Sequence, residues 1–171
     1  MCLKLKILLA SLIICVLTSC GGDKTIIDPE FKVFVSDFEQ KIGVKVQNII
    51  IKFSPTKYPI IGMCITGGET NEIHIDPQNW MGINKDGQEL ILYHELGHCI
   101  LGLPHDDRRS TLDNVSVEGS IMNTYFFGNR SYYSKYKENY KRALRNNTVV
   151  SQEIPMSIWD QALSLLKFLK F

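Results

Sequence analysis

Hydrophobic and polar positions follow two different periods along the first half of the chain. Apolar residues recur at helical spacing over residues 28–43, so we expect a helix that begins at Asp28 and stops at a glycine. The apolar residues within 44–53 are mostly β-branched and predict a strand. Two further strands are predicted over residues 60–66 and 72–75, which are followed by Gly-Gly and Asp-Pro. The first half of the chain is therefore expected to form a helix and a small sheet.

The second half has helical periodicity with a long polar interruption. A capping sequence at residues 86–89 precedes apolar positions that predict a helix running to Gly102. Residues 104–119 are polar and predict irregular structure, followed by a tyrosine-rich helix over 132–144. A last helix over 157–169 carries an apolar stripe, which favours packing onto the domain over resting on a membrane. This order predicts an α+β fold with a mixed N-terminal sheet and a less regular, helical C-terminal half.

The first twenty residues have the pattern of an export signal. Lys4 and Lys6 precede an apolar run over residues 7–17, which is too short to span a bilayer stably. The run ends in Leu-Thr-Ser-Cys, which resembles a bacterial lipobox. We therefore expect cleavage before Cys20 and acylation of that cysteine.

Chain length and the leader together predict three parts. These are a signal peptide over residues 1–19, a tether over 20–27 and one domain over 28–171. A chain of about 150 residues is long enough to bury one hydrophobic core. We expect this domain to be a monomer in the bacterial cell envelope, anchored to a membrane through the lipid on Cys20 and facing the periplasm or the cell surface.

Composition and charge exclude several classes of protein. Apolar residues make up 44% of the chain and charged residues 22%, which excludes a disordered chain and a protein with many membrane spans. Lysine and arginine number 19 against 18 acidic residues, and removing Lys4 and Lys6 with the leader leaves 17 against 18. Because the mature chain has no basic surplus, we expect no nucleic-acid partner.

Two of the five cysteines lie beyond the leader, at Cys64 and Cys99. In an exported domain such a pair can form a disulfide. Buried thiols that pack as small apolar side chains are the alternative. The sequence allows either state, and a zinc site made by the two thiols is less favoured because better ligands lie nearby.

Three of the four histidines fall in one short stretch that carries the candidate chemistry. His94 and His98 are four residues apart, so on a helix both can direct an imidazole at one ion. Glu95 is about a third of a turn away and can reach a water on that ion without becoming a ligand. Gly102 can adopt the left-handed backbone that ends a helix, after which His105 can return as a third ligand. Three protein ligands with one open position are typical of catalytic zinc.

This stretch resembles the signature of the metzincin clan of zinc peptidases, His-Glu-x-x-His-x-x-Gly-x-x-His followed by a methionine turn. The match has one departure, because three residues rather than two separate His98 from Gly102. A longer helix end or a local bulge could absorb the extra residue and deliver His105 to the ion. Otherwise Asp106 or Asp107 could supply the third ligand, since carboxylates also bind zinc.

The resemblance extends to two residues further along the chain. Met122, within Ser-Ile-Met, resembles the methionine turn of the clan and is expected to form an apolar floor beneath the ligands. Tyr125 is a candidate for stabilising the transition state beside the ion, with ordinary packing as its alternative. Some clan members have that tyrosine two residues after the methionine, whereas here the separation is three.

The resemblance implies a small zincin-like catalytic domain that holds one catalytic Zn²⁺ and cleaves peptides or unfolded proteins. Glu95 would act as general base for the zinc-bound water. A strand within residues 67–76, just before the zinc helix, would run along the cleft and pair with extended substrate. Two alternatives remain: a zinc-binding lipoprotein that serves as a binding or structural module, and a zinc hydrolase of a non-peptide amide. The presence of Glu95 favours an enzyme, because a structural site has no use for that carboxylate.

Overall fold

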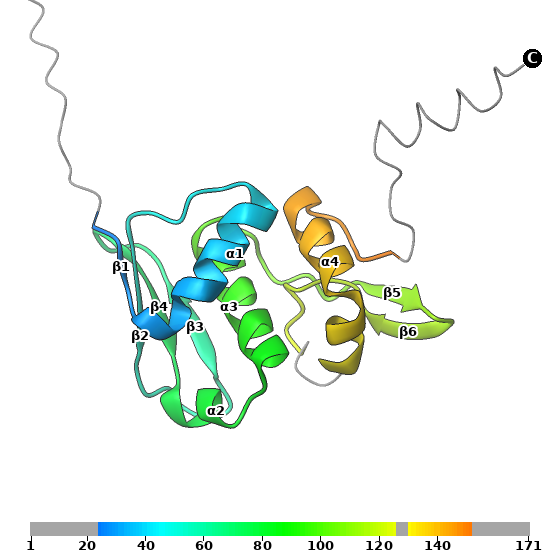
Figure 1. Ribbon diagram of the computed structural model, residues 1–171, viewed down its shortest axis with the longest axis horizontal. Coiled ribbons are helices and arrows are strands. Elements are labelled where there is room, and N and C mark those ends of the chain that lie inside the picture. The colour runs from blue at the N-terminus through cyan, green and yellow to red at the C-terminus, as the bar shows by residue number, and fades with distance from the viewer. Residues whose placement is uncertain (1–23, 126–129, 152–171) are drawn as a thin grey trace, which may run out of the picture.

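The computed structural model describes residues 24–125 and 130–151 and shows a mixed α+β fold, which confirms the α+β part of the predicted fold class (Figure 1). A sheet lies on one side of the molecule with helices beside it, and a hairpin projects beyond the last helix. The elements in chain order are β1 (Ile26–Ile27), the short 3-10 helix η1 (Pro29–Phe31), α1 (Lys32–Ile42), β2 (Ile49–Phe53), β3 (Gly62–Ile65), β4 (Asn71–Ile75), α2 (Pro77–Met81), α3 (Lys85–Cys99), β5 (Arg109–Leu112), β6 (Val115–Glu118) and α4 (Arg130–Asn146).

Helix α1 forms where its periodicity predicts it. The Asp28 carboxylate accepts the Glu30 amide at 3.1 Å and caps η1, which leads into α1. Gly43 ends α1 with a φ of +82°, a conformation that glycine adopts without steric cost. The apolar face that this helix and η1 bury consists of Phe31, Phe34, Val35, Phe38 and Ile42.

The larger sheet has the strand order β1-β2-β4-β3. β1, β2 and β4 are parallel, whereas β3 pairs antiparallel with β4 and lies at the edge. β2 begins at Ile49, so the strand predicted over residues 44–53 was five residues too long. Asn48 has a φ of +53°, which interrupts a strand, and the Val46 amide donates to the Glu39 side chain at 2.9 Å. Residues 26–27, within the predicted tether, form β1.

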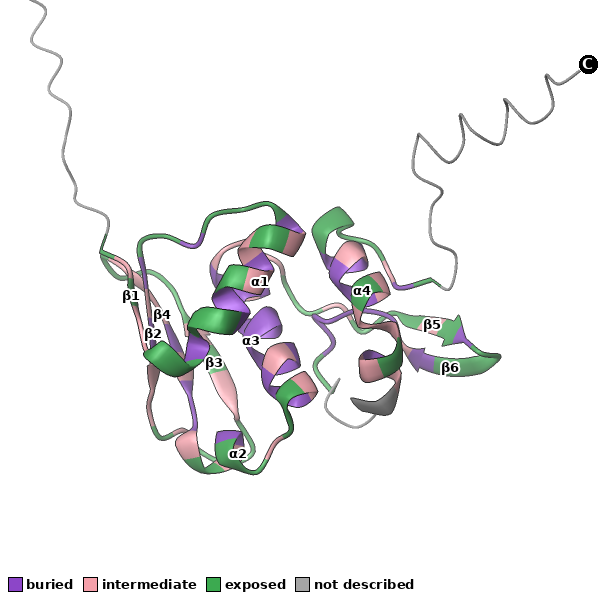
Figure 2. Ribbon diagram, in the orientation of Figure 1, coloured by how far each residue is buried: buried purple, intermediate pink, exposed green. Residues whose placement is uncertain are grey.

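Helix α3 passes through the centre of the molecule, and eleven of its fifteen residues are buried (Figure 2). It contacts β3 and β4 on one side and α1 and α4 on others. Asn84 caps it by accepting the Gly87 amide at 2.9 Å, so the helix begins earlier than the predicted capping sequence. Helix α2 was not predicted, although Asp76 caps it in the same way by accepting the Asn79 amide at 2.9 Å.

The prediction of irregular structure over residues 104–119 was partly wrong. β5 and β6 form an antiparallel hairpin there. Asp113 and Asn114 join the strands with φ values of +51° and +61°, and a turn with two such residues matches the twist of a hairpin. The tyrosine-rich helix is confirmed as α4.

Some sequence predictions concern residues that the structure does not describe. The signal peptide, Cys20 and the helix over 157–169 lie outside the described residues. Among the residues that the structure describes, every helix is too short or too polar to cross a bilayer.

A buried ion-pair network joins α1, α3 and α4. Lys141 is 3% exposed, and its Nζ lies 2.6 Å from the Asp37 carboxylate and 3.0 Å from that of Glu89. The hydroxyls of Tyr93 and Tyr133 donate to the same two carboxylates at 2.7 and 2.8 Å. Burial opposes ionisation of Asp37, but the hydrogen bonds from Lys141 and Tyr93 outweigh it and hold the pKa of Asp37 below its ordinary value.

Replacing Lys141 tests whether this network secures the helices. Lys141→Ala should lower the free energy of unfolding by about 2 kcal/mol at pH 7, because two partly buried carboxylates lose their buried cation. Since the folded-state pKa of Asp37 is depressed, its contribution is present above its unfolded pKa and is lost as pH falls through the folded value. Urea unfolding at pH 7 and at pH 3 should therefore show a smaller difference between parent and variant at the lower pH.

Lys41→Ala is the matched control, because Lys41 makes a salt bridge on the surface, with Glu138. An exposed pair contributes less than about 1 kcal/mol. Equal losses in the two variants would contradict a special role for the buried network.

Candidate metal centre

Three histidines converge beside the C-terminal end of α3. His94 and His98 come from the helix and His105 from the loop that follows it. One ring nitrogen from each lies within 4.8 Å of the others. The ring centroids of His94 and His98 are 4.7 Å apart, and those of His98 and His105 are 4.8 Å apart. This group could hold a metal ion.

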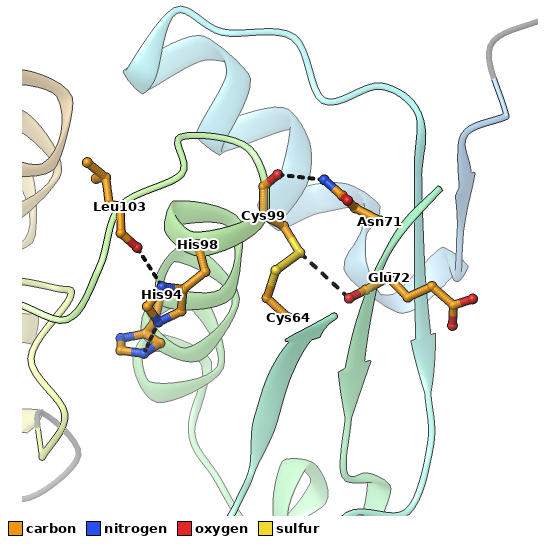
Figure 3. Close-up of a disulfide and its surroundings, with 7 residues drawn as sticks. All are labelled: Cys64, Asn71, Glu72, His94, His98, Cys99 and Leu103. Carbon is orange, nitrogen blue, oxygen red and sulfur yellow. Dashed lines mark hydrogen bonds between the residues drawn. A yellow bond between two sulfur atoms is a disulfide. The ribbon is translucent and has the colours of Figure 1, made fainter. Parts of the chain in front are cut away.

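Two backbone carbonyls orient the helical pair of imidazoles. Nδ1 of His94 donates to the Ile121 carbonyl at 2.7 Å. Nδ1 of His98 donates to the Leu103 carbonyl at 2.6 Å, as Figure 3 shows. Because a carbonyl only accepts, each neutral ring carries its proton on Nδ1 and a lone pair on Nε2. The two Nε2 atoms lie 3.1 Å apart. Two lone pairs at this distance repel one another, whereas a shared cation would attract both, so the arrangement fits a metal ion.

Burial also sets the charge of these rings. It lowers the pKa of His94 to about 4, although the hydrogen bond to Ile121 acts in the opposite direction. The pKa of His98 is lowered as well, chiefly by burial. Both imidazoles are therefore neutral at pH 7, which is the state that a metal ligand requires.

The end of α3 absorbs the extra residue in the histidine pattern. The Leu96 carbonyl accepts the Ile100 amide at 2.8 Å and also the Leu101 amide at 3.4 Å, so the last turn is widened. Gly102 then takes a φ of +64° and turns the chain sharply. The helix ends at Cys99, three residues before the predicted end. This widened turn brings His105 back toward the helix.

The two aspartates that could have replaced His105 have other partners. The Asp106 carboxylate is paired with the Arg108 guanidinium at 2.7 Å. The Asp107 carboxylate accepts the Thr124 amide at 2.8 Å. In the described parts of the chain, the group of residues that could hold a metal contains His105 and neither aspartate.

Glu95 is buried beside the three histidines. Its carboxylate accepts the Cys64 amide, and it packs so closely on Gly62 that a Cβ there would lie 2.7 Å from Oε1. Burial raises the pKa of Glu95 to about 7, against the opposing effect of the Cys64 amide. We did not predict these two strand residues, although a glycine inside a strand often indicates close approach of another group.

Met122 lies against the face of α3 that carries Gly97. It is 2% exposed, its amide donates to Ser120 Oγ at 3.1 Å, and a Cβ at Gly97 would overlap its sulfur. The neighbouring residue Ile121 orients His94, so this turn contacts the histidine site directly. Tyr125, in contrast, is 78% exposed and lies in the wall of the cleft beside the histidines.

A cleft of about 1010 Å³ contains the site. Its wall includes strand β3, which lies at one edge of the sheet. The prediction that residues 67–76 supply the edge along the cleft was therefore wrong, because β4 is paired on both sides, with β2 and β3. β3 precedes β4 in the chain but lies beyond β4 in the sheet, at the edge.

Cys64 and Cys99 form a disulfide between β3 and the end of α3 (Figure 3). Of the two states that the sequence allows, the structure therefore has the disulfide. The same helix end is held by the Asn71 side chain, whose Nδ2 donates to the Cys99 carbonyl at 3.1 Å.

The three-histidine group that could hold a metal ion and the buried carboxylate of Glu95 therefore lie in one cleft of an α+β domain. No protein-family model, curated protein or solved structure matches this chain.

The identity of the third ligand can be tested by metal binding. His105→Ala should weaken zinc binding by more than about 100-fold, since loss of a ligand exceeds the 10- to 100-fold cost of losing a group that supports one. Asp106→Ala and Asp107→Ala should leave zinc affinity unchanged. Competition titration against a chromogenic chelator measures the zinc affinity of all three variants. Strong zinc binding by the histidine variant, with loss in either aspartate variant, would assign the ligand to that carboxylate.

Proposed function

We propose that this protein is a zinc-dependent endopeptidase of metzincin-like architecture. The observation that carries the proposal is the cluster of three imidazole donors within 4.8 Å, with the buried carboxylate of Glu95 in the same cleft. Structural zinc sites are filled by four protein ligands, whereas catalytic sites have three and leave a position open to water or substrate. A three-histidine group on the wall of an open cleft has the number of ligands that is typical of a catalytic site.

The donor set favours zinc over other ions. Imidazole nitrogens suit a borderline ion, whereas magnesium and calcium prefer oxygen ligands. A bound zinc ion supplies a Lewis acid that lowers the pKa of water toward about 7 and favours negative charge on a carbonyl oxygen. The chain supplies the orientation: the carbonyls of Ile121 and Leu103 hold His94 and His98 in the tautomer that presents Nε2.

Glu95 acts as the general base in this proposal. Its carboxylate accepts a proton from the attacking water and later delivers it to the nitrogen of the leaving amine. The Cys64 amide and the backbone of Gly62 hold the carboxylate in place, so it needs no rearrangement before it accepts the proton. Tyr125, in the cleft wall, is proposed to add a hydrogen bond to the developing oxyanion.

The substrate is proposed to be a peptide or an unfolded protein bound in extended form. The outer edge of β3 borders the cleft and has no strand partner within the described parts of the chain. Extended peptides bind such edges through main-chain hydrogen bonds. Apolar residues such as Ile60, Met63 and Leu103 also border the cleft and suit uncharged side chains of the substrate.

We also propose that the protein acts outside the cytoplasm, anchored in the bacterial cell envelope through a lipid on Cys20. The export pattern of the leader supports this location. The Cys64–Cys99 disulfide supports it independently, because disulfides persist mainly in oxidising compartments.

Cleavage of a quenched peptide library by the zinc-loaded protein tests the proposal. We expect the parent to cleave and Glu95→Gln to lose about 10²- to 10⁴-fold in kcat/KM, because the general base is removed. Zinc content should be the same in both proteins, as measured by atomic emission. Mass spectrometry of the products gives the preferred side chains.

Glu72→Gln is the matched control, because Glu72 lies on β4 beside Lys52 and outside the cleft lining. This variant should cleave as well as the parent. Turnover by Glu95→Gln at the parental rate would contradict the mechanism. If the parent holds one zinc ion but cleaves no peptide, a binding module becomes the better explanation.

A further inference from the structure

Strand β3 and helix α3 face each other through two matched pairs of residues. Glu95 and Cys99 are four residues apart and lie on one face of the helix, separated by about 6 Å along its axis. Gly62 and Cys64 are two residues apart and share one face of the strand, separated by about 6.6 Å. Gly62 packs on the Glu95 carboxylate, and Cys64 is bonded to Cys99. The two spacings are nearly equal, so both pairs can form at once.

The backbone of β3 adds a hydrogen bond to this alignment. The Asp76 amide donates to the Ile61 carbonyl at 2.8 Å, so these two residues form a hydrogen-bonded pair next to Gly62 and Ile75, where β3 and β4 begin to pair. Along an antiparallel strand, every second residue directs its amide away from the partner strand. Cys64 lies three residues after Ile61 and is one of these residues, so its amide points away from β4. There it donates to the Glu95 carboxylate.

β3 would be weakly held without its covalent link. It has four residues, and the side chains of Met63 and Ile65 are each 38% exposed. Within the described residues its ladder lies on one side only. Short, exposed edge strands open locally at a low free-energy cost. A shift of two residues would preserve the alternation of faces but would move Gly62 off Glu95, and the disulfide prevents that shift.

We propose that the Cys64–Cys99 disulfide is a positioning element of the site: it fixes the register of β3 along α3 and thereby holds the Glu95 carboxylate between Gly62 and the Cys64 amide. The effect on turnover rests on the proposed peptidase function. The effect on register does not, because it concerns the packing of the strand on the helix.

Amide hydrogen exchange in the zinc-free protein tests the register directly. The variant Cys64→Ser/Cys99→Ser and the chemically reduced parent should both exchange the amide at position 64 at least about tenfold faster than the oxidised parent. The amide of Ile73, on the neighbouring strand β4, should keep its protection. Unchanged exchange at position 64 in both forms overturns the proposal. An equal loss of protection at Ile73 also overturns it, because the disulfide would then support the whole fold.

Two single variants distinguish the effect of the disulfide on amide exchange from the effects of neighbouring contacts. Asn71→Ala removes the hydrogen bond to the Cys99 carbonyl but keeps the disulfide, so exchange at Cys64 should match the parent. Gly62→Ala keeps the disulfide but displaces the Glu95 carboxylate, so exchange at Cys64 should accelerate. Faster exchange in Asn71→Ala, equal to that of the double serine variant, would overturn the proposal.

Turnover gives the second measurement. In the double serine variant kcat should fall about tenfold or more, because a misplaced carboxylate is costly to the reaction. Zinc affinity should change by less than the tenfold or so that loss of a ligand-supporting group causes. Absence of cleavage by the parent would count against the proposed function alone, and the exchange rates would still decide the role of the disulfide.

Discussion

The burial of α3 is the constraint on which the rest of the structure depends. A buried polar side chain needs a hydrogen-bond partner, and this helix carries several. Three buried or largely buried groups find partners on different neighbours: Glu89 on α4, His94 on the turn at Ile121, and Glu95 on β3. The contacts that stabilise the helix in the core are therefore also the contacts that orient the side chains of the cleft.

Local signals predicted the fold where a helix had its own caps and a continuous apolar face. Helix α1, with Asp28 before it and Gly43 after it, is the clearest case. The hairpin β5–β6 was missed because its strands are short and polar, and only the turn residues Asp113 and Asn114 indicated it. β2 was predicted too long because β-branched residues favour a strand without showing where the backbone must bend.

The candidate site likewise has parts that the sequence could predict and parts that it could not. The spacing of His94 and His98 is a property of one helix, so the sequence was sufficient to place them on one face. His105 depends on a widened helical turn, and the cleft edge depends on the spatial order of strands, which the order along the chain does not determine. The state of Cys64 and Cys99 could not be predicted for the same reason, because it follows from the position of β3.

The faces of α3 also link its side chains to different parts of the molecule. His94 and His98 are oriented by segments that follow the helix in the chain, whereas Glu95 is held by a strand that precedes it. The histidine pair and the Glu95 carboxylate thus have separate structural supports, although these residues are adjacent in sequence. Evolution or protein engineering can therefore tune one through the C-terminal loops and the other through the sheet, with little interference between them.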